Sequence, residues 1–140
     1  MISISIPSRL RGVAGCLLIL ASGCGASHDG PVRYQINGTV TYDDKPVPNG
    51  FVSFAPDSTQ GNKGPGGGAP IDQGRFKTEA NRGTVGGPHV VKIVGYDGVS
   101  VSVEGEQLAH GKPLFPPYET TIDFPKKDGP IEFKVPNAAP

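Results

Sequence analysis

One stretch of the chain, residues 38–56, constrains the fold more than any other. In residues 39–42, threonine alternates with valine and tyrosine, and this two-residue period is typical of a half-buried β-strand. Residues 43–50 contain two Asp, two Pro, an Asn and a Gly, which together require the chain to turn. Residues 51–55 are largely apolar again, and Pro56 ends the run. The stretch therefore predicts a strand, a turn and a second strand.

Further short apolar runs, each bounded by turn-forming residues, predict the other strands. Residues 90, 91, 93 and 94 are all apolar, as expected for a strand that is covered on both faces. The predicted strands are 33–42, 51–55, a hairpin over 71–76 with its turn at residues 72–74, a central strand at 89–96, an edge strand at 99–103, and a final pair at 120–124 and 131–135.

The segments between these strands are expected to be loops and turns. Residues 57–69 are rich in glycine and predict a flexible loop. A second long loop is expected at 104–117, with Leu114 and Phe115 folded back onto the domain. Residues 126–129 read Lys-Lys-Asp-Gly, and the Asp-Gly dipeptide predicts that the last two strands form a hairpin.

The alternation within each strand also predicts its buried face. Gly38 falls on such a face, which predicts a bulge or a close neighbour at that position. The pattern as a whole predicts an all-β sandwich of seven to eight strands. The side chains expected to point inward are Tyr34, Ile36, Val40 and Tyr42 in the first strand, Val52 and Phe54 in the second, and Ile131, Phe133 and Val135 in the last.

Composition supports one small domain and excludes some classes of partner. The chain has 140 residues and no net charge, so its length suits a single domain and its charge gives no case for nucleic acid binding. Its 21 Gly and 15 Pro punctuate short apolar runs instead of forming one biased tract. No apolar run reaches the roughly 18 residues that a membrane-spanning helix needs.

The first residues have the composition of a secretory signal. Residues 1–12 carry Arg9 and Arg11 and no acid, and residues 13–21 are almost wholly apolar. A basic segment followed by a short apolar segment is typical of a cleaved export signal.

The residues that follow, Leu-Ala-Ser-Gly and Cys24, resemble the lipobox of bacterial lipoproteins. In that family the cysteine is acylated and the signal is cut immediately before it, so the resemblance implies a lipid on Cys24. The position three residues before the cysteine is usually leucine and here is Ala21. Cys16 ends a second match, but Arg9 and Arg11 lie where its apolar segment should be. The alternative is that Cys24 is an ordinary free or disulfide-bonded cysteine.

These patterns predict the organisation of the chain. Residues 1–23 are expected to be the signal peptide, 24–31 a flexible tether, 32–136 the β-sandwich and 137–140 a tail. The expected location is the bacterial cell envelope, at the outer membrane or cell surface, with the lipid on Cys24 as the membrane anchor.

Four blocks in order resemble carboxypeptidase-regulatory-like domains. They are the opening hairpin at 38–56, Asp-Gln-Gly-Arg-Phe at 72–76, Gly-Gly-Pro-His-Val-Val-Lys-Ile at 86–93, and 114–124. The resemblance implies a transthyretin-like sandwich, although His89 stands where an aromatic residue is usual. It also implies an accessory structural or protein-interaction role, with envelope proteins or polysaccharide as partners.

Three kinds of protein with a related fold carry out a chemical reaction, and the sequence lacks the residues that each reaction needs. Hydroxyisourate hydrolase ends in Tyr-Arg-Gly-Ser, whereas this chain ends Val-Pro-Asn-Ala-Ala-Pro. Intradiol dioxygenases bind iron with two Tyr and two His, and here His89 and His110 form no close pair. Collagen-adhesin domains form a Lys–Asn isopeptide bond, but residues 33–42 contain no lysine. We therefore expect no enzyme activity, catalytic residue, metal or cofactor.

Each remaining candidate for a binding residue can be interpreted either as structural or as functional. We expect His89 to be a partly buried, hydrogen-bonded side chain, although it is also a candidate ligand. Asp43 and Asp44 could bind calcium, but adjacent carboxylates in a turn are more often solvated. The functional alternative for the whole protein is a small carbohydrate- or metal-binding module, with Tyr42, Tyr96 and Tyr118 as an aromatic platform for sugar.

Overall fold

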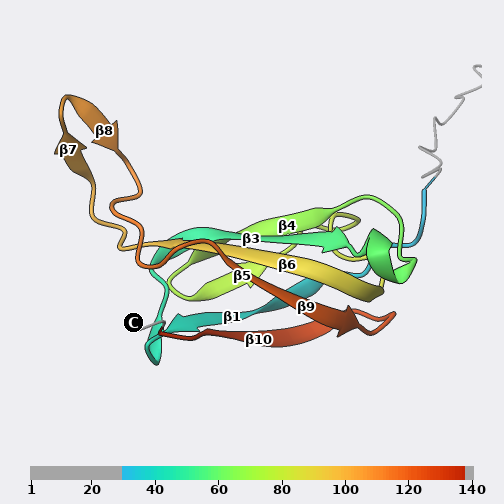
Figure 1. The fold of residues 1–140 in the computed structure, drawn as a ribbon. Coiled ribbons are helices and arrows are strands. Elements are labelled where there is room, and N and C mark those ends of the chain that lie inside the picture. Colours follow the sequence, from blue (N-terminus) through green and yellow to red (C-terminus); the bar gives the residue numbers. More distant parts are fainter. Residues whose placement is uncertain (1–29, 138–140) are drawn as a thin grey trace, which may run out of the picture.

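The fold was established from a computed structural model, which describes residues 30–137. The described chain is all-β apart from one short 3₁₀ helix, as the sequence predicts (Figure 1). Its elements are β1 (Ile36–Tyr42), β2 (Lys45–Pro46), β3 (Asn49–Pro56), η1 (Ser58–Gln60), β4 (Gly67–Asp72), β5 (Arg75–Lys77), β6 (Gly87–Tyr96), β7 (Val101–Val103), β8 (Glu106–Leu108), β9 (Tyr118–Phe124) and β10 (Gly129–Val135).

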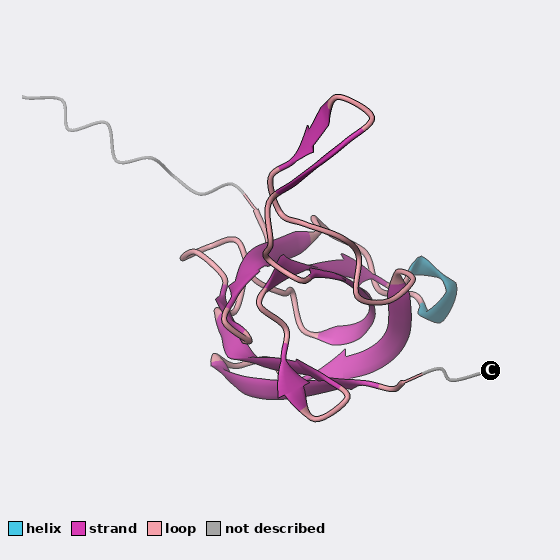
Figure 2. Cartoon of the chain, turned by 90° about the vertical axis from the view of Figure 1, so that its left-hand side faces the viewer, coloured by secondary structure: helices cyan, strands magenta, loops and turns pink. Residues whose placement is uncertain are grey.

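Eight of these strands form one curled sheet, within the predicted seven to eight. The order along the sheet is β10-β1-β5-β4-β3-β6-β9, and β2 pairs with the end of β1. All pairs are antiparallel except β1 with β10, which run parallel. Seen from one end, the sheet curves around a central space that the side chains fill (Figure 2). This arrangement is consistent with a β-sandwich.

The core lies inside the curl, and Phe54 of β3 is at its centre. The Phe54 ring makes an edge-on contact with Phe124 at 5.4 Å between centroids and lies 6.1 Å from Phe76 and 6.4 Å from Phe133. Aromatic contacts of this kind add to the free energy gained by burial. The buried apolar side chains are Ile36, Val40, Val47, Val52, Phe54, Ala69, Ile71, Phe76, Val91, Ile93, Phe115, Phe124, Phe133 and Val135.

The predicted inward faces are largely confirmed. Ile36, Val40, Phe133 and Val135 are buried, as are the two inward residues of the second strand. Tyr42 and Ile131 are partly buried and pack against the core, whereas Tyr34 precedes β1 and forms only an isolated bridge with Thr84. The predicted start of the first strand at residue 33 is therefore three residues too early.

Gly38 has the close neighbour that the sequence predicts. It lies beside Ile131 in the parallel pair of β1 and β10. A Cβ atom at residue 38 would overlap the Ile131 carbonyl oxygen. Glycine therefore allows the first and last strands of the domain to approach.

The prediction of a hairpin between the last two strands is wrong. β9 pairs with β6, and β10 pairs with β1, so the two strands lie at opposite edges of the sheet. The Asp-Gly dipeptide instead bonds to the chain that precedes β1. Asp128 Oδ1 accepts a hydrogen bond from Gln35 N at 2.7 Å. Gly129 N also donates to Gln35 O at 3.2 Å. These bonds fasten the start of β10 beside the chain leading into β1.

The predicted loop at 57–69 is also only partly correct. Residues 58–60 form η1, and β4 already begins at Gly67, where it pairs with Phe54 of β3. The strand can contain two glycines because Phe51 covers the backbone at Gly68, where a Cβ would lie 2.8 Å from the Phe51 ring. An aromatic ring that covers a glycine in a neighbouring strand compensates for the missing side chain.

Residues 99–103 are not an edge strand of the sandwich, in contrast to the prediction. Val101–Val103 is β7, which pairs only with β8, and β8 lies inside the predicted loop 104–117. The β7–β8 hairpin projects from the end of the sandwich (Figures 1 and 2). The expectation for the following residues is confirmed, since Phe115 is buried and Leu114 packs against the core.

The N-terminal predictions fall almost wholly outside the described chain. The signal peptide at 1–23, Cys24 and most of the tether at 24–31 lie outside residues 30–137, as does most of the tail at 137–140. Within residues 30–137, no helix has the length and apolar character needed to cross a bilayer.

Candidate functional site

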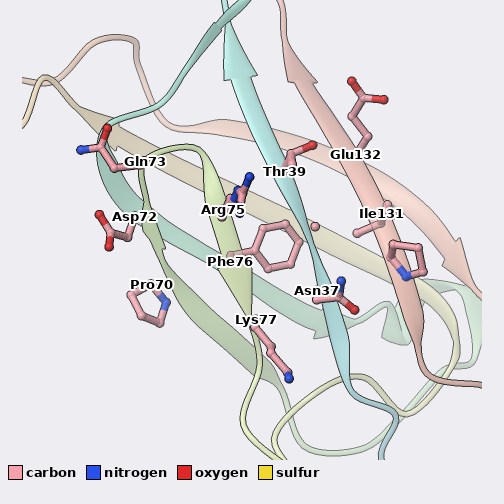
Figure 3. Close-up of a pocket in the computed structure, with 12 residues that line it drawn as sticks. Asn37, Thr39, Pro70, Asp72, Gln73, Arg75, Phe76, Lys77, Ile131 and Glu132 are labelled. Carbon is pink, nitrogen blue, oxygen red and sulfur yellow. The ribbon is translucent and has the colours of Figure 1, made fainter.

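A groove that is largely open to solvent runs over the outer face of β10, β1, β5 and β4, with a volume of about 1220 Å³ (Figure 3). Apolar surface forms much of its lining, with polar side chains along its rims. The lining residues are Asn37, Gly38, Thr39, Pro70, Asp72, Gln73, Arg75, Phe76, Lys77, Pro130, Ile131 and Glu132.

Strand register brings the polar side chains of the groove together. Thr39 lies opposite Arg75 on one side and Glu132 on the other, so the three form one row across the sheet. Asn37 lies opposite Lys77 and forms a second row two residues away. Because residues opposite each other share a face of the sheet, both rows point outward, and all five side chains are exposed.

The groove is wide because β4 and β5 separate soon after the turn that joins them. The two strands pair only through Asp72 and Arg75. Gln73 and Gly74 form the turn with φ angles of 48° and 75°, the left-handed values of a tight hairpin turn. Further along β4, Pro70 has no N–H with which to continue a ladder toward β5.

The two cations of the groove are not engaged in ion pairs within the described chain. Its three salt bridges join Arg82 with Glu79, Lys92 with Glu119, and Lys134 with Glu132, and none involves Arg75 or Lys77. These cations and the amide of Asn37 are free to donate hydrogen bonds to a ligand, and the nearby carboxylates can accept them. The arrangement suits recognition of a polar ligand on an apolar floor.

His89 is hydrogen-bonded, as expected from the sequence, but its side chain is fully buried and not partly buried. Asn62 Nδ2 donates to the carbonyl oxygens of Gly86 at 3.0 Å and Pro88 at 2.7 Å, which uses both of its protons. The Nδ1 of His89 therefore carries the proton and donates to Gly87 O at 2.8 Å. Its Nε2 has no partner within the described chain.

Asp57, which no sequence pattern singled out, is the one carboxyl whose pKa is clearly displaced among the described groups. A hydrogen bond from the Thr59 hydroxyl at 2.6 Å, joined by one from Gln60 Nε2 at 2.8 Å, lowers the pKa of Asp57 below its usual range. Asp57 also accepts from Thr59 N at 3.0 Å and so caps η1. These bonds hold η1 against the start of β6, where Asp57 N donates to Pro88 O at 2.9 Å.

Asp43 and Asp44 form the exposed turn between β1 and β2, with φ angles of 51° and 57°. The described residues contain no group of three or more His, Cys, Asp or Glu side chains placed to hold a metal ion. No third side chain of these four types therefore joins Asp43 and Asp44 within the described residues.

The three candidate platform tyrosines are all half-buried. Tyr42 lies against Phe115, with 4.9 Å between ring centroids, and Tyr118 also packs on the core. Tyr96 lies 6.1 Å from the ring of His110. This supports packing at the rim of the core as the role of Tyr42 and Tyr118.

Sequence reasoning missed the groove and found only some of its parts. The outward positions of β1, β5 and β10 follow from their alternation, but their assembly depends on β10 lying beside β1. The predicted hairpin had placed β10 elsewhere. Cys24, the residue that the sequence predicts to be lipidated, lies outside the described residues.

Comparison of the chain with protein-family models, with curated proteins and with solved structures gives no match.

Proposed function

We propose that this protein is a lipid-anchored component of the bacterial cell envelope, with a non-enzymatic β-sandwich in a structural or protein-interaction role. One observation carries the proposal: a basic segment, an apolar segment and small residues precede Cys24, and the first strand of the all-β domain, β1, starts twelve residues later, at Ile36. A lipid on Cys24 would thus hold the domain close to a membrane surface.

We further propose that the domain is a transthyretin-like sandwich of the carboxypeptidase-regulatory-like kind. The eight-stranded curled sheet supports this, as does the order of strand, turn and strand in residues 38–56, which contain β1, β2 and β3. In this proposal the domain presents surfaces and does not perform a reaction. The groove supports that role, because its side chains offer hydrogen bonds along an open apolar floor.

Intact mass spectrometry of the chain recovered from its native membrane tests the anchor. The proposal expects a mature chain that begins at Cys24 and carries acyl mass. A Cys24→Ala variant should lose that mass, and the matched Cys16→Ala variant should keep it. An unmodified chain cut at another position overturns the proposal and favours a secreted or periplasmic module.

The groove favours a second candidate function, the binding of an envelope polysaccharide. Sugar hydroxyls would accept hydrogen bonds from Arg75 and Lys77 and donate to Asp72, all of which line the groove. Retention of the purified chain on insoluble cell-wall polysaccharide is the readout. Arg75→Ala with Lys77→Ala should abolish retention, whereas Lys92→Ala, an exposed cation paired with Glu119, should not. Equal retention of all variants would exclude the groove.

A further inference from the structure

A second pocket, which we call the cation pocket, lies beside the first half of β4 and has a volume of about 310 Å³. This volume is at the lower end of the range of small-molecule sites. Two cations and one aromatic ring surround the pocket, and none of the residues that line it is acidic. The lining residues are Arg33, Phe51, Gly66, Gly67, Gly68 and Arg82. The pocket is therefore suited to an anionic ligand.

Backbone without side chains forms the part of the cation pocket that β4 contributes. A Cβ atom at Gly67 would overlap the carbonyl oxygens of Arg82 and Gly83. A Cβ atom at Gly68 would lie 2.8 Å from the Phe51 ring. These glycines thus leave room for a ligand between the arginines and the ring.

Hydrogen bonds to the backbone hold the guanidinium group of Arg33 in place at the pocket. Its Nε and Nη2 donate to Gly83 O at 3.3 and 2.9 Å, and Nη2 also donates to Gly66 O. These bonds leave the two N–H groups of Nη1 without a partner within residues 30–137. Because the orientation of Arg33 is already fixed, its side chain loses little freedom when it binds a carboxylate.

Arg82 supplies the second positive charge, at the rim of the pocket. Its Nε lies 3.4 Å from Glu79 Oε2, but the two side chains are 74% and 80% exposed. An exposed pair of this kind adds little free energy, so a ligand carboxylate can replace Glu79 as the partner of Arg82. Even with Glu79 counted, Arg33 and Arg82 leave the pocket a net positive charge.

The Phe51 ring forms the apolar wall of the cation pocket and is 46% exposed. Phe51 lies opposite Pro70 in the pairing of β3 with β4, and Pro70 lines the groove. Because residues opposite each other share a face of the sheet, apolar surface continues from the pocket to the groove. An exposed aromatic face beside a cation suits a ligand that has both a flat apolar surface and a negative charge.

We propose that the cation pocket binds a sugar ring that carries a carboxylate, such as a uronic acid unit of an envelope polysaccharide. The carboxylate binds Arg33 and Arg82, and the C–H face of the sugar ring packs on Phe51. The choice of a sugar over other ring-shaped acids rests on the polysaccharide binding proposed for the groove, which the same polysaccharide enters over Pro70. A simple anion would use the arginines but leave the Phe51 ring exposed.

Nuclear magnetic resonance titration of the isotope-labelled full chain tests the ligand. The probe is a trimer of galacturonic acid, and the matched control is the same trimer with its carboxylates methyl-esterified. The proposal expects the acid trimer to shift the backbone signals of residues 66–68, and the ester to bind about tenfold more weakly. Equal binding of the two trimers would overturn it. Acetate that binds as tightly as the acid trimer would also overturn it, because the arginines would then form a general anion site.

Two substitutions test the charged and the apolar part of the pocket. Arg82→Gln and Phe51→Leu should each weaken binding of the acid trimer about fivefold, since one removes a charged hydrogen bond and the other the aromatic face. Lys92→Gln, which removes an exposed cation of β6 outside the pocket, is the matched control and should leave binding unchanged. Arg33 is kept intact because its bonds to the backbone support the fold. Unchanged binding in both pocket variants contradicts the site.

A variant of the groove separates this inference from the proposal for the groove. Arg75→Gln with Lys77→Gln leaves the cation pocket intact, so the acid trimer should still shift the signals of residues 66–68. Loss of binding in this variant, with unchanged binding in Arg82→Gln, would place the trimer in the groove and overturn the cation pocket alone. Trimer binding that depends on Arg82, in a chain that insoluble polysaccharide retains equally well without Arg75 and Lys77, would exclude the groove and support the pocket.

Discussion

Gly38 of β1 and Ile131 of β10 lie side by side in the one parallel pair of the described sheet, and their backbones are in contact. Any side chain at residue 38 would meet the Ile131 carbonyl oxygen instead of a flexible neighbour. The pairing of the first strand with the last therefore depends on the absence of a Cβ atom at this position.

Gly38→Ala should lower the free energy of unfolding by about 1–3 kcal/mol, because the backbones must separate to admit the methyl group. Urea denaturation of the purified chain measures the loss. Gly129→Ala, in the same strand pair but with no heavy atom within 4 Å of its added methyl group, is the matched control and should change stability far less. Equal losses in both variants would show that the contact at residue 38 is not the cause.

Replacement of Asp44 by glycine should stabilise the protein. Asp44 has a φ angle of 57° in the β1–β2 turn, a conformation that glycine adopts without strain. We expect Asp44→Gly to raise the free energy of unfolding by about 0.5–1 kcal/mol, and Asp44→Val to lower it. Thermal denaturation followed by circular dichroism compares the three proteins. A loss of stability in the glycine variant would mean that the carboxylate has a role in the turn that its conformation does not reveal.

Asp57 should make the stability of the protein dependent on acid pH. The hydrogen bonds from Thr59 and Gln60 depress the pKa of Asp57 in the folded state. The stability that the ionised Asp57 adds to the folded state is therefore fully present above the unfolded-state pKa of about 3.9. It is lost as the pH falls through the lower folded-state pKa.

The Asp57→Asn variant should accordingly have a lower melting temperature than the unmodified protein at pH 7. The difference should shrink below about pH 4 and disappear in stronger acid. Melting temperatures between pH 2 and pH 7 measure this, with Asp123→Asn, an exposed carboxyl on β9, as the control. A constant difference across that range would assign the effect to capping geometry alone and not to charge.

Phe54 and Phe51 lie on opposite faces of β3 and should respond differently to truncation. Phe54 is fully buried among three other aromatic rings, whereas Phe51 is 46% exposed. Phe54→Ala should cost about 3–5 kcal/mol in the free energy of unfolding, and Phe51→Ala much less. Chemical denaturation at one pH compares them. Similar losses would contradict the position of the core.

The features of the fold that depend on side-chain alternation and on local turns could be predicted from the sequence. The two strands and the turn of residues 38–56, the hairpin around Gln73 and Gly74, the strand β6 and the burial of Phe54 and Phe133 all follow from patterns a few residues long. The two strands of residues 38–56, β1 and β3, do not pair with each other as a hairpin would require. Each of the predicted features depends on side-chain period or on a residue that tolerates positive φ, and both are visible in the chain itself.

The partners of the last strand could not be predicted in the same way. Asp128 and Gly129 carry the signal of a hairpin turn, yet Asp128 bonds to Gln35, which is 93 residues away. The choice between a neighbouring strand and a distant one depends on the whole sheet, and no local pattern records it. The groove could not be predicted from local patterns either, since Thr39 and Glu132 become neighbours only when β1 pairs with β10.

The parallel contact of β1 with β10 also has a consequence for how the protein is made. A sheet whose first strand needs its last one stays incomplete until the chain has been synthesised beyond Val135. Pairings this distant in sequence form slowly, because a long loop must close first. During that delay the edge of β1 that β10 later covers stays open, with its backbone N–H and C=O groups unpaired. The domain therefore closes its sheet in the last step of its folding, when β10 reaches β1.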